Sequence, residues 1–249
     1  MLRSEREQEL LELLRKSGYA SVHELSKKLY TSESTVRRIL GSLEGKGLVS
    51  RSYGGAELQE HYAQADPFST RAKSHTSAKR EIAAKAAALV PDGSILFLDQ
   101  SSTTFFLAEA LLKKRSMTVV TNSLEIAALL ARTEFEVFVS GGSLSRQMRM
   151  CMVGEDAQRI FREIRADFAF FSARSLSDDG IISDCYREEI CIRRTMMENA
   201  ACRVFLCDSS KFGTQSGYRQ CVLTDVDILI SEADSGKRFS HWEDPLRII

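Results

Sequence analysis

The stretch from Thr31 to Leu43 reads TSESTVRRILGSL, and it decides how the first part of the chain folds. Thr31 and Ser32 offer a side-chain hydroxyl at the point where a helix can begin. Val36, Leu40 and Leu43 follow at spacings that place them on one face of a helix. The other face carries hydroxyl groups and two adjacent arginines. The stretch therefore predicts an amphipathic helix with an apolar inner face and a basic outer face.

The neighbouring sequence predicts two further helices and a hairpin within residues 1–56. A first helix is expected over about residues 3–16, before Gly18. Residues 21–24, Ser-Val-His-Glu, have the pattern of a capping box and start a second, short helix. Two glycines end the central helix, and residues 48–55 predict a small hairpin that ends in Gly-Gly. This order of elements is typical of a winged helix-turn-helix domain.

Basic side chains are concentrated around the central helix. The 249-residue chain has 34 basic and 34 acidic side chains, so its zero net charge excludes a uniformly basic nucleic-acid-binding surface. Residues 27–51 nevertheless carry six basic and two acidic side chains, and such a patch suits a phosphate backbone. A solvated basic face on an ordinary three-helix module is the alternative. The DNA contacts expected in the major groove and at the hairpin come from Ser32, Ser34, Thr35, Arg37, Arg38, Arg51 and Tyr53.

The rest of the chain predicts a second, larger domain. Residues 57–77 contain few aliphatic side chains and are expected to form a linker or a loosely packed arm. Residues 78–249 alternate between helical and strand patterns, which favours an α/β domain with a mostly parallel sheet. We expect this domain to sense a ligand and to mediate oligomerisation. The fold class is therefore α/β: an N-terminal winged helix-turn-helix domain and a larger α/β sensing domain.

Polar residues follow the predicted strands of the second domain. In an open parallel sheet, ligands bind beyond the carboxyl ends of the strands. Hydroxyl groups and free backbone N–H groups at the start of a helix suit an anion, and a lysine adds positive charge. The residues expected to bind such an effector are Asp99, Ser101, Ser102, Thr103, Thr104, Thr121, Asn122, Gly141, Gly142 and Lys211.

Other kinds of site receive no support from the sequence. The six cysteines show no Cys-X-X-Cys spacing and the four histidines are scattered, so we expect no metal, no cofactor and reduced thiols. The chain opens without an apolar signal core, and no run of about 18 apolar residues predicts a membrane span. These features favour a cytoplasmic protein with no membrane partner.

Several motifs together resemble the DeoR family of bacterial transcriptional regulators. The resemblance starts at Arg6 and includes Thr35-Val36-Arg37-Arg38 and Tyr53-Gly54-Gly55-Ala56. It continues through the second domain and includes Asp99, Ser102-Thr103-Thr104, Val119-Val120-Thr121-Asn122-Ser123, Gly141-Gly142 and Asp208-Ser209-Ser210-Lys211-Phe212-Gly213. The chain differs from the family pattern in four places. Ile39 stands for an aspartate, Tyr53 for a histidine and Ser101 for a glycine, and Ala173-Arg174-Ser175 replaces a stretch that is commonly small and glycine-containing.

The resemblance implies a sequence-specific regulator, by family habit a repressor of genes for sugars or related metabolites. It also implies a sensor domain similar to sugar-phosphate isomerases, a phosphorylated sugar-type effector, a double-stranded DNA operator and a homo-oligomer, dimer or tetramer. Two alternatives stay open. One is a sugar-phosphate isomerase that uses Asp99, Asp208 and Lys211; the other is an interaction module without an effector. We expect the regulator, with no catalytic residues and no enzyme activity.

Overall fold

The chain consists of two compact units, Met1–Gln64 and Ala65–Ile249, and each is described by itself. In the computed structural model, no helix of the described residues is long and apolar enough to cross a membrane. The structure describes residues 3–17, 19–45, 49–52, 54–58, 68–148, 150–232, 236–242 and 246–249.

The first unit contains the three helices and the hairpin that the sequence predicts. Its antiparallel sheet has the order β1-β3-β2. Ser21 caps the second helix, and the capping box with Glu24 is present. Val36, Leu40 and Leu43 are buried, as their spacing predicted, and pack with Leu10 and Leu14 in the core of the unit. The elements are α1 (Arg3–Ser17), β1 (Tyr19–Ser21), α2 (Val22–Lys28), α3 (Glu33–Gly45), β2 (Val49–Ser52) and β3 (Gly55–Leu58).

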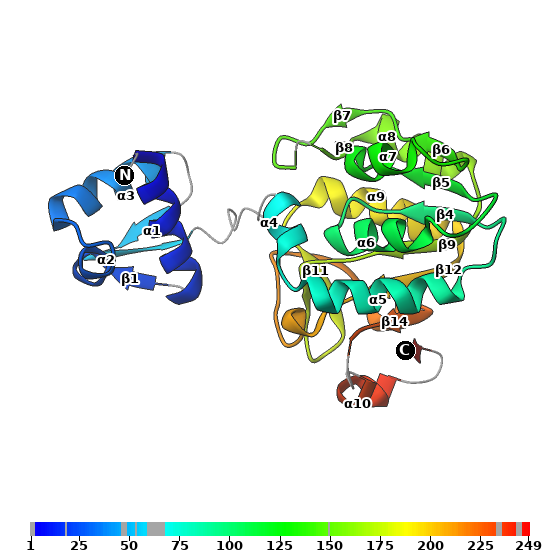
Figure 1. Ribbon diagram of the computed structural model, residues 1–249. Helices are drawn as coiled ribbons and strands as arrows, with labels where there is room; N and C mark the ends of the chain where they lie inside the picture. Colours follow the sequence, from blue (N-terminus) through cyan, green and yellow to red (C-terminus); the bar gives the residue numbers. More distant parts are fainter. Residues whose placement is uncertain are drawn as a thin grey trace. The chain divides into compact units, whose positions relative to one another are not determined.

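The second unit is built on a parallel sheet of seven strands, ordered β15-β14-β12-β9-β4-β5-β6 (Figure 1). This confirms the predicted α/β fold class. Its sheet strands are β4 (Ile95–Leu98), β5 (Thr118–Thr121), β6 (Glu136–Val139), β9 (Ala166–Phe171), β12 (Ala200–Leu206), β14 (Ile228–Ile230) and β15 (Arg247–Ile248). The main helices are α4 (Phe68–Lys73), α5 (Thr76–Leu89), α6 (Ser102–Leu111), α7 (Leu124–Leu130), α8 (Glu155–Glu163), α9 (Arg187–Glu198) and α10 (Gly236–Phe239).

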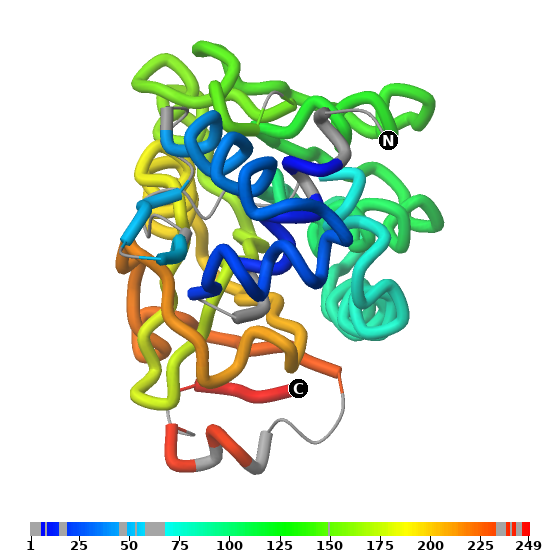
Figure 2. The backbone as a smooth tube through the Cα atoms, turned by 90° about the vertical axis from the view of Figure 1, so that its left-hand side faces the viewer, coloured from blue at the N-terminus to red at the C-terminus, as the bar shows by residue number. Residues whose placement is uncertain are grey.

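Side chains alternate between the two faces of this sheet. On β4, Leu96 and Leu98 pack under α5, α6 and α7, whereas Phe97 packs against α8 and α9. Figures 1 and 2 show α5 and α6 side by side along one face. A strand that is covered on both faces carries apolar side chains at successive positions, as the sequence ILFL of β4 illustrates.

The connections reverse direction between β4 and β9. From β4 the chain adds β5 and β6 on one side, and it then returns to add β9, β12, β14 and β15 on the other. At such a switch point the loops that follow two neighbouring strands diverge and leave room for a ligand. We therefore expect a ligand between the loop at Asp99 and the loop at Ser172, and we call this part of the sheet edge the switch-point crevice.

Some smaller elements were not expected from the sequence. A second sheet has the order β10-β11-β13, formed by β10 (Ser175–Leu176), β11 (Ile181–Asp184) and β13 (Tyr218–Val222). A hairpin joins β7 (Ser143–Leu144) to β8 (Met152–Val153). The short helix α4 lies inside the segment 57–77, where the sequence predicted a linker, and its Phe68 ring packs edge-on against Phe105 at 5.3 Å.

Replacing Phe161 with alanine tests the packing of the α8 and α9 layer. Phe161 is fully buried and lies edge-to-face with Phe97 at 5.1 Å. The variant should lose about 3–5 kcal/mol of unfolding free energy, because the cavity cannot collapse fully. Urea denaturation followed by the fluorescence of Trp242, the chain's single tryptophan, measures the second unit alone. The control Phe138→Ala, at a side chain 36% exposed, should cost less than about 1.5 kcal/mol, and equal losses would contradict the assignment.

Candidate functional site

The start of α3 is organised by serine and threonine hydroxyls. The Ser32 hydroxyl accepts a hydrogen bond from the Thr35 amide at 3.3 Å and lies 2.9 Å from the hydroxyls of Ser34 and Thr35. This is the helix start that the sequence predicted. Ser34 is exposed and Thr35 is partly exposed, so both hydroxyls lie on the outer surface of the helix.

Two acidic residues that the sequence analysis did not single out hold predicted DNA-contacting arginines. Arg37 forms an ion pair with Glu33, one helical turn earlier, at 3.1 Å, and Glu33 also lies 3.2 Å from His23 Nδ1 on α2. Arg51 on β2 lies 3.4 Å from Glu44. The spacing of Glu33 and Arg37 by four residues was the available signal. These pairs orient the guanidinium groups without burying them.

The remaining residues of this surface divide between exposed, buried and undescribed positions. Arg38 is exposed on α3. Ile39, which stands where the family pattern has an aspartate, is 3% exposed and belongs to the core of the unit. Tyr53 lies outside the residues that the structure describes. An aspartate at position 39 would have to be buried in the same core.

In the second unit, Asp99 lies in the loop after β4, beside the loop after β9. Its carboxylate accepts hydrogen bonds from the Ser101 amide, the Thr104 hydroxyl, the Ser172 amide and Arg193 Nε, at 2.8–3.2 Å. The side chain is 0% exposed. These donors occupy both oxygens, so Asp99 fastens the loops after β4 and β9 to each other.

The loop after β4 leads into the first turn of α6. Ser101 caps this helix, since its hydroxyl accepts a hydrogen bond from the Thr104 amide at 3.2 Å. The Thr104 hydroxyl, which donates to the Asp99 carboxylate, also lies 2.8 Å from the Asp99 carbonyl oxygen. The hydroxyl of Thr103 is buried without a hydrogen-bond partner in the described structure, and Ser102 is buried beside it. The amino end of α6 thus offers amide dipoles and an unsatisfied hydroxyl.

The predicted residues after β5 reach the same region. Gly142, after β6, lies against β8, and the Met152 carbonyl of β8 accepts a hydrogen bond from Asn122 Nδ2 at 3.1 Å. Asn122 Nδ2 donates to Gln100 Oε1 at 3.2 Å, and its Oδ1 has no partner in the described structure. Thr121 donates to the Leu98 carbonyl at 2.7 Å and so serves the sheet. Gly142 follows the edge strand with a φ of +96°, and a Cβ there would lie 2.4 Å from a carbonyl oxygen of β8. This close approach is enough to explain why position 142 is a glycine, and no bound ligand is needed to explain it.

Lys211 joins the loops after β9 and β12. Its Nζ donates to the Ser172 hydroxyl at 2.8 Å and lies 3.3 Å from Asp208. Burial would raise the pKa of Asp208, but Lys211 and a hydrogen bond from Ser210 hold it below its ordinary value. A second lysine lies nearby: burial and the charge of Lys211 lower the pKa of Lys79 to about 8. Lys211 therefore brings a cation, paired with Asp208, to the loops after β9 and β12.

A buried ionic cluster lies beneath these loops, and the sequence analysis missed it. Arg193 on α9 is 2% exposed and forms ion pairs with Asp99, Asp184 and Glu189 at 2.9, 2.7 and 3.2 Å. Gln100 donates to Glu189 Oε2 at 2.6 Å, and Glu189 Oε1 is buried without a partner in the described structure. Glu189 and Arg193, four residues apart on one helix, were the only sequence signal.

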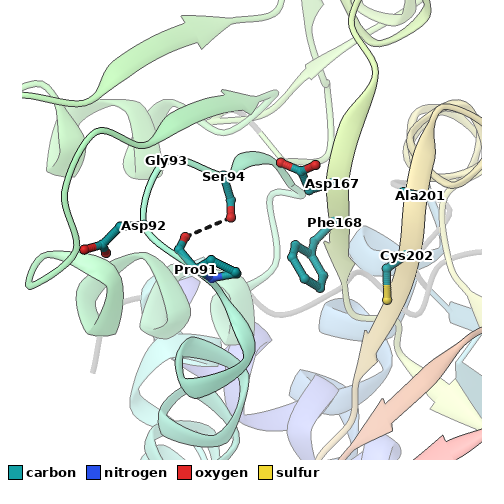
Figure 3. A pocket seen from close by; sticks show the side chains of 8 residues that line it. All are labelled: Pro91, Asp92, Gly93, Ser94, Asp167, Phe168, Ala201 and Cys202. Atoms are coloured by element: carbon teal, nitrogen blue, oxygen red, sulfur yellow. Dashed lines mark hydrogen bonds between the residues drawn. The ribbon is translucent and has the colours of Figure 1, made fainter.

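A hollow of about 490 Å³ lies at the opposite edge of the sheet, where strands begin (Figure 3). Asp92 and Asp167 are its charged residues, and Asp167 accepts a hydrogen bond from the Ile95 amide at 2.8 Å. An acidic lining without a cation does not suit a phosphorylated ligand. Within the residues described, no group of His, Cys, Asp or Glu side chains could hold a metal ion, and the six cysteines form no disulfide.

Replacing Asp99 with asparagine tests its role as the fastener of the two loops. The amide would remove one charge from the buried cluster and place an N–H group against a donor, so the variant should lose about 3–5 kcal/mol of unfolding free energy. Urea denaturation followed by Trp242 fluorescence gives the value. The matched change Glu134→Gln, at an exposed position, should be nearly neutral. Wild-type stability in Asp99→Asn would show that the carboxylate is not structural.

The titration of Glu189 should appear in the pH dependence of stability. Burial raises the pKa of Glu189 from 4.5 to about 7, although Arg193 opposes the shift. Between these values the folded chain holds a proton that the unfolded chain has released, so stability is lost as pH rises toward 7.

From pH 5 to pH 8 the wild type should therefore lose about 2 kcal/mol more unfolding free energy than Glu189→Gln. Denaturation in urea at constant ionic strength measures both profiles, with Glu188→Gln, an exposed neighbour, as the control. Parallel profiles for wild type and Glu189→Gln would refute the buried titration.

A comparison with solved structures finds weak similarity to ribose 5-phosphate isomerase a from Methanocaldococcus jannaschii. The two chains are 20% identical, with a TM-score of 0.42 over 56% of this chain and 55% of the other. Nothing about activity follows from similarity at this level.

The sequence comparisons cover almost the whole chain. Residues 6–61 match the DeoR-like helix-turn-helix domain, and residues 74–233 match the DeoR C terminal sensor domain. The glycerol-3-phosphate regulon repressor of Escherichia coli is 30% identical over 94% of this chain and 92% of its own length. The L-fucose operon activator of Haemophilus influenzae is 31% identical over 98% and 99%, and the repressor CsqR of Escherichia coli is 33% identical over 83% and 79%. The chain belongs to the DeoR family of DNA-binding transcriptional regulators.

Proposed function

We propose that this regulator represses genes for a sugar or a related metabolite and that a phosphorylated sugar-type effector controls it. The observation that carries the proposal is the group of buried polar residues at the switch point of the sheet. There the amino end of α6 and Lys211 supply positive potential, while Thr103, Asn122 and Glu189 present buried polar atoms without partners. Buried polar atoms of this kind are costly unless a ligand or water satisfies them.

The exposed surface of α3 is the proposed reader of the operator. The hydroxyls of Ser32, Ser34 and Thr35 suit phosphate oxygens, and Arg37 and Arg38 suit guanine edges or phosphates. Glu33 holds Arg37 on this surface by an ion pair at 3.1 Å. Arg51, and Tyr53 by its position in the sequence, would contact the DNA backbone from the hairpin. The partner is double-stranded DNA.

Asp99 is proposed to act on the effector through the loops that it fastens, since its oxygens already accept four hydrogen bonds from the protein. The proposed direct contacts come from Ser102, Thr103, Asn122 and Lys211. The backbone around these contacts is held by hydrogen bonds of Ser101, Thr104 and Thr121. The turn after β6, next to β8, is formed by Gly141 and Gly142.

The names of two relatives support an effector or regulated pathway of this chemical class. One is a glycerol-3-phosphate regulon repressor and the other an L-fucose operon activator. We propose repression because two of the relatives, the glycerol-3-phosphate regulon repressor and CsqR, are named as repressors. A homo-oligomer, dimer or tetramer, would place paired helix-turn-helix units on repeated half-sites. We place its action in the cytoplasm, where a prokaryotic operator is accessible.

We propose no enzyme activity. The isomerase alternative needs a carboxylate base that is free to reach a sugar C–H bond. Asp99 is saturated by protein donors, and Asp208 is held by Lys211 and Ser210. Incubation of the purified protein with ribose 5-phosphate tests this directly, and turnover would favour the isomerase.

The double variant Arg37→Ala with Arg38→Ala tests the assignment of α3. Specific DNA binding should fall by at least about a hundredfold, since both arginines would leave the major groove. Fluorescence anisotropy on the DNA upstream of the protein's own gene, against a scrambled duplex at fixed salt, measures it.

The matched control removes two exposed arginines of the other unit, Arg115→Ala with Arg132→Ala. This control has the same net charge and should bind DNA like the wild type. Retained tight, sequence-selective binding by the Arg37 and Arg38 variant would refute the recognition helix.

A further inference from the structure

Arg71 carries a guanidinium group that lacks a suitable acceptor. It lies on α4, the first helix of the second unit, which follows the DNA-binding unit in the chain. Its Nη2 is 3.9 Å from the sulfur of Met148, and its Nε is buried without a partner among the described residues. A guanidinium has five N–H donors, and a thioether sulfur is a weak acceptor. The group is therefore poised for an acceptor that is not part of the described structure.

Arg71 acts electrostatically on the walls of the crevice. Burial raises the pKa values of Glu125, Cys151 and Glu189, and the charge of Arg71 opposes each of these shifts. The guanidinium is therefore near these groups. Even so, no carboxylate of the described residues approaches it within ion-pair distance.

The same crevice holds two buried oxygens that lack donors. Asn122 Oδ1 and Glu189 Oε1 have no partners in the described structure, and Gln100 links their side chains through bonds of 3.2 and 2.6 Å. The Arg71 guanidinium lacks an acceptor, and the two oxygens lack donors. One ligand could satisfy all three groups. It carries an oxyanion for Arg71 and hydroxyl groups for the two oxygens, which is the composition of a phosphorylated polyol.

The contacts that hold α4 in place are few. The Phe68 ring packs on Phe105 at 5.3 Å, and Lys79 Nζ donates to the backbone carbonyls of Arg71 and Ser74. A helix of six residues with so few anchors belongs to the low-stability part of a structure. An added bond from Arg71 to a bound anion would strengthen its attachment to the sheet.

We propose that Arg71 binds the anionic group of the effector and that this contact transmits occupancy to the DNA-binding unit through α4. The inference rests on the proposed function, because it names a contact and a route of regulation for the same site. The bond exists only while α4 is attached, so the attached and detached states differ in affinity for the effector. That difference is what a coupled response requires.

Inorganic phosphate is the probe for the anion contact. Thermal unfolding of the full-length protein, followed by Trp242 fluorescence, is measured in increasing sodium phosphate against sodium chloride of equal ionic strength. The wild type should show a saturable rise of about 3–5 °C, because a ligand of the folded state stabilises it. Arg71→Gln and Arg71→Ala should lose most of this rise. Lys73→Ala, which removes an exposed charge from the same helix, should keep it.

The absence of a saturable rise in the wild type, or an equal rise in the Arg71 variants, would overturn the anion contact. General salt effects on stability are shared by all variants, so they cancel in the comparison. Arg71→Gln and Arg71→Ala are both used in case one of them folds poorly. In sodium chloride both should unfold at the same temperature as the wild type.

Operator binding tests the transmission separately. Phosphate should change the anisotropy-derived affinity of the wild type for specific DNA at least about threefold, and Arg71→Gln should abolish this change while binding DNA normally in chloride. A phosphate effect that persists in Arg71→Gln would overturn the route through α4. A wild type that does not select its DNA would instead refute the proposed function, while the thermal result would still decide the anion contact.

Discussion

The guanidinium of Arg193 lies inside the protein, where it is shared by three carboxylates. Asp99 follows β4, Asp184 ends β11, and Glu189 lies one turn earlier on α9. Removing such charges from water is costly, and the cost is recovered only when every partner is in place. The cluster therefore requires that the main sheet, the small sheet and α9 meet in one arrangement. The loops that form the crevice lie directly on this arrangement.

The same requirement explains why the crevice is polar and partly unsatisfied. Asp99 uses its oxygens to fasten the loops after β4 and β9, and Gln100 connects Glu189 to Asn122. Three carboxylates around one guanidinium leave excess negative charge below the loops, and burial keeps Glu189 partly protonated near neutral pH. Lys211 and Arg71 lie close enough to Lys79 to lower its pKa, so these three cations share one region. A ligand with an anionic end and hydroxyl groups matches this separation of charge.

The two faces of α3 have different roles: one packs in the core of the first unit, and the other carries the polar side chains proposed to contact DNA. Val36, Ile39 and Leu40 hold the helix in the core, so the polar face is presented by packing. Glu33 and Glu44 then restrict two long arginine side chains without burying them, which reduces the entropy that contact with DNA would cost. The family's aspartate is replaced by Ile39 in the core, and Glu33 provides the acidic partner from the outer face.

The amino-acid sequence by itself determined the local elements and the order of the domains. The spacing of Val36, Leu40 and Leu43, the capping box at Ser21 and the apolar run of β4 follow from periodicity and capping, which act over a few residues. Only the tertiary structure decided which polar residues meet. The strand order brought Asp99 to Ser172 and Arg193, and the tertiary fold placed Arg71 beside Met148. These contacts join residues far apart in the chain, and pairing across a sheet depends on every strand at once, so no local pattern encodes it.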